Sequence, residues 1–177
     1  MKASPTRVLR EEHAVLLDVL TRFEGALANA AIGGESVLRR LAVFVDVFRG
    51  YADYCHHRKE EQGLFVLLEA HELGTAVECM REEHGEARAL ISRLAEAVDA
   101  GDAAGIRDAG HGYLDLLRSH IEKENCMLFE AADECLTSGE IAELAVRYAE
   151  IETEQAYEAT QTRCRAHIES LLGAELN

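Results

Sequence analysis

The chain has 177 residues, enough for one domain with a sizeable core, and its good helix formers and single proline, Pro5, favour an all-α fold. Its formal net charge is −15, and because so acidic a surface repels phosphate backbones we expect no nucleic-acid partner. No apolar run approaches the roughly 18 residues that span a bilayer, and the N-terminal residues lack the apolar stretch of a signal peptide, so we expect no membrane association and a cytoplasmic location.

Apolar residues recur at helical spacing along almost the whole chain. Glycine-containing turns divide the first part of this pattern into four segments. The expected helices cover about residues 6–31, 35–71, 75–99 and 103–135. Because the connections are short, neighbouring helices must run antiparallel. Residues 1–136 are therefore predicted to form an up-down-up-down four-helix bundle.

A fifth helix is expected after Thr137 and ends near Leu172. It is polar for much of its length, but a broken apolar stripe that includes Leu144 and Tyr148 runs along it. We therefore expect residues 137–177 to form an additional long C-terminal helix. It would pack on the outside of the bundle or against a partner subunit, in a homodimer.

The bundle segment contains an internal repeat. Residues 10–13 read Arg-Glu-Glu-His, and residues 81–84 have the same sequence. Residues 56–65 and 120–129 share the pattern His-x-x-Lys-Glu-x-x-x-Leu-Phe. Each half of the bundle is thus a helical hairpin with one histidine on its first helix and a His-x-x-x-Glu pair on its second.

The repeat predicts a site for two metal ions. Histidine and glutamate four positions apart lie on one face of a helix, so both can reach a common point. Two such pairs and two single histidines would bring four imidazoles and two carboxylates together, with the glutamates bridging two ions. This donor set suits iron or manganese and is acceptable to zinc, and burying it without a cation would be costly. The predicted metal ligands are His13, His56, Glu60, His84, His120 and Glu124.

The second helix offers another register, because His57 and Glu61 directly follow the two chosen residues. The apolar stripe of this helix and the alignment of the two repeats favour His56 and Glu60. We then expect His57 and Glu61 to face solvent or to contact the ligands from outside. The alternative, in which His57 and Glu61 replace them as ligands, stays open.

Residues 10–129 resemble the hemerythrin-like, HHE cation-binding family in the segments EEH, HHRKEEQGLF, REEH and HIEKENCMLF. The resemblance implies an up-down four-helix bundle and a non-haem di-iron centre, in which two carboxylates and an oxo or hydroxo group bridge two iron ions. It implies one histidine ligand from each of the four helices and two glutamate bridges. On this chain those residues are His13, His56, His84 and His120, with Glu60 and Glu124.

The chain departs from the oxygen-carrying hemerythrins, which have a fifth histidine one turn from the third-helix ligand. Met80 and Arg88 stand one turn either side of His84. In this respect the chain is more similar to bacterial di-iron proteins of nitric-oxide stress and iron–sulfur cluster repair. The resemblance implies a protein that binds or senses oxygen, nitric oxide or peroxide, with a small diatomic or peroxo ligand as its partner. A redox enzyme of the nitric-oxide or peroxide stress response or of iron–sulfur cluster repair is the first alternative, and an iron-handling module is the second.

Overall fold

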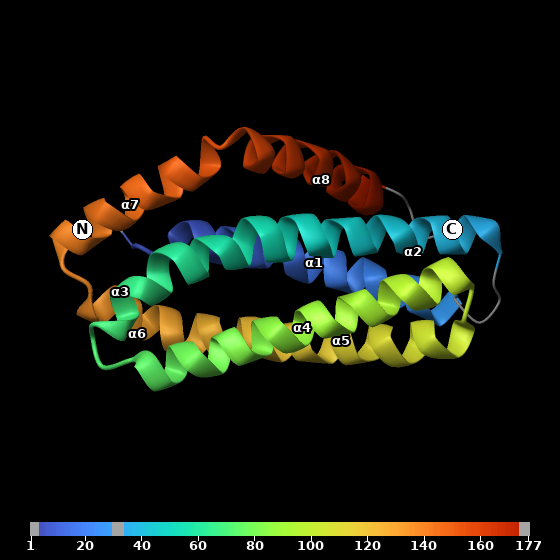
Figure 1. Cartoon of the computed structure of the whole chain (residues 1–177), viewed down its shortest axis with the longest axis horizontal. Coiled ribbons are helices and arrows are strands. Elements are labelled where there is room, and N and C mark those ends of the chain that lie inside the picture. Colours follow the sequence, from blue (N-terminus) through green and yellow to red (C-terminus); the bar gives the residue numbers. More distant parts are fainter. Residues whose placement is uncertain (1–3, 30–33, 174–177) are drawn as a thin grey trace.

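The computed structural model describes residues 4–29 and 34–173, and all regular secondary structure in these ranges is helical (Figure 1). The predicted all-α fold is therefore confirmed. Within the same ranges, no helix is long and apolar enough to cross a membrane.

Four helical rods lie side by side and form the bundle (Figure 1). The first and third rods are single helices, α1 (Arg7–Asn29) and α4 (Gly74–Ala100). The second rod consists of α2 (Glu35–Val47), η2 (Phe48–His57), η3 (Glu60–Leu64) and α3 (Phe65–Glu69). The fourth rod consists of α5 (Ala103–Lys123), η4 (Glu124–Leu128) and α6 (Phe129–Cys135).

The segments η2, η3 and η4 are π-helical, and all three lie where the His-x-x-x-Glu pairs were predicted. A π-turn closes its hydrogen bond one residue later than an α-turn, so neighbouring side chains are separated by a smaller angle around the axis. In η2 this brings both His56 and His57 to the buried side of the rod.

Two apolar clusters fill the bundle on either side of a polar layer. The larger cluster is built around the rings of Phe23, Phe44, Phe48 and Tyr113. The smaller one lies toward the other end of the bundle. Its members include Leu9, Phe65, Met80, Leu128 and Phe129. Along every rod, the predicted ligands lie between residues of the two clusters, so the metal site occupies a single level of the core.

The C-terminal segment forms two helices instead of the single one expected, α7 (Ser138–Glu152) and α8 (Gln155–Gly173). A capping box between Thr137 and Glu140 starts α7. The break at Thr153 and Glu154 changes the direction of the chain (Figure 1). Because of this bend, α7 packs against η3, while α8 packs on η2, α1 and α2. A division into domains at residue 136 and a homodimer through this segment stay predictions.

Candidate metal centre

The six predicted ligands meet in the core of the bundle. Each comes from the element on which its motif stands, and all six are at most 2 % exposed. Burying imidazoles and carboxylates costs free energy unless an opposite charge compensates them. The residues are His13 on α1, His56 on η2, Glu60 on η3, His84 on α4, His120 on α5 and Glu124 on η4.

Two pairs of imidazoles face each other through their Nε2 atoms. The two Nε2 atoms are 2.8 Å apart in the pair His13–His56 and 3.1 Å apart in the pair His84–His120. Two nitrogens that bind one ion at about 2.1 Å and at a right angle are about 3.0 Å apart. Each pair therefore has the spacing of two imidazoles that share one metal ion.

Two carboxylates lie between these pairs. Glu60 Oε1 is 3.3 Å from His56 Nε2, and Glu60 Oε2 is 3.4 Å from His84 Nε2. Glu124 Oε2 is 3.2 Å from Nε2 of both His13 and His120. Each glutamate thus touches one histidine of either pair, which is the arrangement that two bridging carboxylates require.

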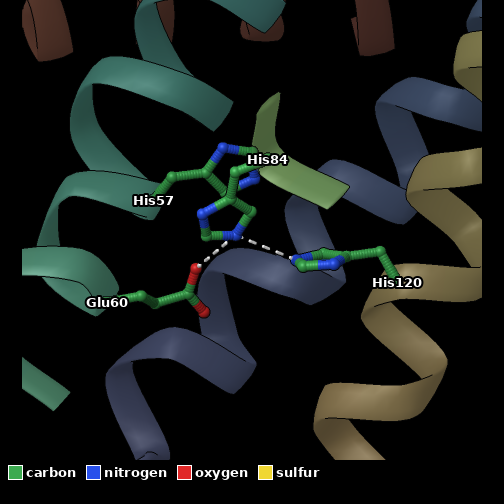
Figure 2. A group of neighbouring side chains, drawn as sticks. All are labelled: His57, Glu60, His84 and His120. Carbon is green, nitrogen blue, oxygen red and sulfur yellow. Dashed lines mark hydrogen bonds and ion pairs between the residues drawn. The ribbon is translucent and has the colours of Figure 1, made fainter. Parts of the chain in front are cut away.

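His57, which was expected to face solvent or to contact the ligands from outside, is also part of this cluster and does not face solvent. Its side chain is 1 % exposed, and its ring stacks on His84 with 3.8 Å between the centroids. Figure 2 shows His57 beside His84 and His120, with Glu60 below them. One potential ligand atom from each of these four residues lies within 4.8 Å of the others. The structure therefore gathers five imidazoles, and both His56 and His57 are among them.

Of the alternative register, His57 enters the cluster and Glu61 does not. Glu61 lies outside the cluster, where Oε1 accepts a hydrogen bond of 2.8 Å from His84 Nδ1. Met80, one turn from His84, belongs to the smaller apolar cluster. The sequence signal for the additional imidazole was the adjacent histidine pair, which a purely α-helical spacing cannot place on one face.

The Nδ1 atoms of four ligand histidines are all held by oxygen atoms. Glu12 accepts from His56 and Glu83 accepts from His120, each over 2.9 Å. His84 pairs with Glu61, as described above, and His13 Nδ1 lies 3.0 Å from Oδ1 of Asn125. Such contacts fix the ring so that Nε2 carries the lone pair toward a metal. Glu12 and Glu83 are the repeated second glutamates of the Glu-Glu-His segments, which explains why these recur.

A metal ion fits the atoms that the protein itself leaves without partners. All four carboxylate oxygens of Glu60 and Glu124 are buried without a hydrogen bond, and so are both ring nitrogens of His57. Buried polar atoms are normally satisfied, and each exception costs free energy. Six such atoms in one cluster of nitrogen and oxygen donors are the expected signature of a cation site.

A comparison of the sequence with known protein families shows to which family the chain belongs. The sequence model of the hemerythrin HHE cation-binding domain matches residues 4–132. The chain is a member of that family. No curated protein and no solved structure matches it significantly. The match covers every candidate ligand and the four rods up to residue 132, within α6, whereas α7 and α8 lie beyond it.

Two lysines contact the glutamates that hold histidines of this HHE centre. Lys59 Nζ donates to Glu12 and, over 3.0 Å, to Glu152 of α7, and Lys123 Nζ donates to Glu83. The side chain of Lys59 is fully buried, whereas that of Lys123 is 37 % exposed. The C-terminal helices therefore cover one half of the HHE centre and leave the equivalent part of the other half open to solvent.

Without metal, the charges within the HHE centre compensate one another. Burial lowers the pKa of His56, but Glu60 and Glu12 outweigh it and raise this pKa to about 10. Burial likewise raises the pKa of Glu60, but His56 and His84 hold it well below the usual range. For His57 burial and the neighbouring His84 act together, and its pKa falls well below that of free histidine. A neutral His57 keeps a lone pair available to a metal.

Proposed function

We propose that this protein holds two non-haem iron ions in its core and binds oxygen, nitric oxide or peroxide at them. The observation that supports it is the cluster of five buried imidazoles and two buried carboxylates in a member of a cation-binding family. Iron held by these residues would supply an open coordination position and two accessible oxidation states.

The donors are divided unequally between the two ion positions. His13 and His56 face the first, which we call the two-histidine position. His57, His84 and His120 face the second, the three-histidine position. With Glu60 and Glu124 shared, the two-histidine position has one protein ligand fewer. We infer that a small ligand completes the coordination there.

The donor set favours iron over zinc. Zinc in proteins is usually four-coordinate and often takes thiolates, whereas the candidate clusters contain nitrogen and oxygen donors only. With three imidazoles and two shared carboxylates, one position already exceeds four protein ligands. That number suits a metal that accepts five or six ligands, as iron does with imidazole and carboxylate.

The test is to load the full chain with ferrous iron without oxygen, admit air, and measure iron content and the optical spectrum. We expect two iron ions per chain, near-ultraviolet absorption of a bridged ferric pair, and new absorption when azide, the probe ligand, is added. The double variant His56→Ala with His120→Ala takes one histidine from each position and should no longer hold two iron ions. Two equivalents of iron in that variant, or no response of the wild type to azide, would contradict the proposal.

A further inference from the structure

Tyr148 is a buried residue of α7 that lies outside the matched family domain. It is 7 % exposed, and its hydroxyl is buried without a hydrogen-bond partner among the residues that the structure describes. A buried tyrosine normally places its hydroxyl against a partner. An unpaired hydroxyl at this position therefore points to a partner that is not part of the chain.

The ring of Tyr148 packs on the turn that carries Glu60. A Cβ atom on Gly63, three residues further along the rod, would lie 2.7 Å from Tyr148 Cε1. On another side of the ring, Lys59 Nζ is 6.0 Å from its centroid. The absence of a side chain at Gly63 is thus what allows the tyrosine ring to pack against this turn of the rod.

The contacts around Tyr148 place it in the half of the bundle that contains His56. Lys59, whose Nζ lies 6.0 Å from the ring centroid, donates to Glu12, and Glu12 accepts a hydrogen bond from His56 Nδ1. His56 faces the two-histidine position, so Tyr148 lies in the same half of the bundle as that position. A phenol hydroxyl is protonated at neutral pH and can donate a hydrogen bond to an anion.

The internal repeat shows that this contact exists in only one half of the bundle. The position of Gly63 corresponds to Met127 in the second repeat, which is 68 % exposed, so no helix of the described part of the chain covers it. The C-terminal helices therefore deliver a hydroxyl to the half that contains His56, where the coordination has fewer protein ligands. The carboxylate oxygens of Glu60 and Glu124 accept no hydrogen bond from it.

We propose that Tyr148 is a ligand-binding residue of the centre, and that its hydroxyl donates a hydrogen bond to a small anionic or polar ligand at the two-histidine position. The inference rests on the proposed function, because it requires iron and an exogenous ligand at that position. It adds a specificity element from outside the family domain. Ligands with an acceptor atom beyond the one that binds iron would be favoured.

Tyr148→Phe tests the inference because it removes the hydroxyl and keeps the ring. In the iron-loaded full chain the variant should retain two iron ions and bind azide about tenfold more weakly, the loss expected for one hydrogen bond to a charged ligand. The infrared stretch of bound azide should shift between light and heavy water in the wild type and not in the variant. Gly63→Ala, which forces the ring away, should weaken azide binding in the same direction.

Tyr157→Phe is the matched control. Tyr157 is a fully buried tyrosine of α8 that also lies beside Lys59, and its hydroxyl accepts a hydrogen bond from Gln161. This variant should bind azide as the wild type does. If Tyr148→Phe retains its iron and binds azide as tightly as the wild type, this inference is overturned while the proposed function is not. Loss of iron in that variant would overturn it too, since the hydroxyl would then serve metal retention. A wild type that ignores azide would instead refute the proposed function.

Discussion

His57 has a different electrostatic setting from the histidine next to it. His56 lies between Glu12 and Glu60, whose carboxylates raise its pKa when no metal is present. His57 has Asp53 3.5 Å from Nδ1, no hydrogen bond on either nitrogen, and a pKa lowered by burial and by His84. Adjacent residues therefore differ in their state, and His57 is the imidazole that a metal can take without displacing a proton.

His57→Ala is expected to open the three-histidine position. The remaining ligands there equal those of the two-histidine position, so iron should still bind, but one of the two ions should be lost to a chelator faster. Azide titration should show a second binding event in the variant and a single one in the wild type. His167→Ala, which changes a surface histidine near Asp46, should alter neither result. A variant that binds one azide and loses both ions at the wild-type rate would contradict a ligand role for His57.

Glu12 and Glu83 make equivalent contacts, but their lysine partners differ in exposure to solvent. Each holds a histidine and a lysine, but Lys59 is fully buried and Lys123 reaches solvent. Glu12→Ala leaves a buried cation with one remaining carboxylate, Glu152, whereas Glu83→Ala leaves a cation that water can solvate. Breaking a buried pair costs several kcal/mol and an exposed one about 0 to 1 kcal/mol.

We therefore expect Glu12→Ala to lower the free energy of unfolding of the iron-free protein by about 2 to 4 kcal/mol more than Glu83→Ala. Urea denaturation of both variants measures this difference. In the loaded protein both changes should weaken iron affinity by about 10- to 100-fold, because each frees one ligand histidine. Equal destabilisation by the two variants would show that the C-terminal helices do not isolate Lys59 from water.

At the scale of the elements, the sequence predicted the helices well and their internal geometry poorly. Gly-containing turns and apolar spacing located all four rods, because these signals are local. The π-helical turns of η2 and η3 carry no such signal, since they depend on what packs in the core. For this reason the apolar stripe favoured His56 over His57, whereas the structure brings both into the cluster. The break at Thr153 was missed for a similar reason, because it follows from how α7 and α8 pack on the bundle.

The docking of α8 on η2 depends on a close approach at Gly50. A Cβ atom there would overlap with Cys164 Sγ, and both residues are buried. Gly50→Ala should therefore destabilise the protein by about 1 to 3 kcal/mol through overpacking. Gly85→Ala is the control: it is exposed in α4 with open space around it, so the same change should stabilise by about 0.5 to 1 kcal/mol. Urea denaturation of both variants would show opposite signs, and stabilisation by Gly50→Ala would contradict this docking.

The bundle consists of a repeated helical hairpin, and its two halves are not equivalent. The two halves supply equivalent histidines, carboxylates and lysines, as the internal repeat predicted. The differences arise from His57 on one hairpin and from α7 and α8, which pack on that same hairpin. The two proposed ion positions are consequently unlike, and the one with fewer candidate ligands lies in the half of the bundle on which the C-terminal helices pack. The repeat alone predicts two equal positions, so this asymmetry required the tertiary packing.

The centre also couples the stability of the fold to pH. In the iron-free protein burial lowers the pKa values of His56 and His84, but nearby carboxylates outweigh it and raise them from 6.5 to about 10 and about 9. A group whose pKa is raised on folding stabilises the fold fully below its unfolded pKa, and this contribution is lost as pH rises through the folded value. The iron-free protein should therefore lose stability between about pH 6.5 and pH 10.

Iron acts in the opposite direction over the same range, because it binds neutral imidazole and competes with those protons. Removing iron with a chelator should lower the melting temperature at every pH, and the difference between loaded and iron-free protein should widen as pH rises from about 6 to about 9. Differential scanning fluorimetry of both forms, with iron content verified, measures this gap. Bound iron and protons compete for the same nitrogens only if the histidines face each other as described. A gap that stays constant or narrows with rising pH would show that they do not.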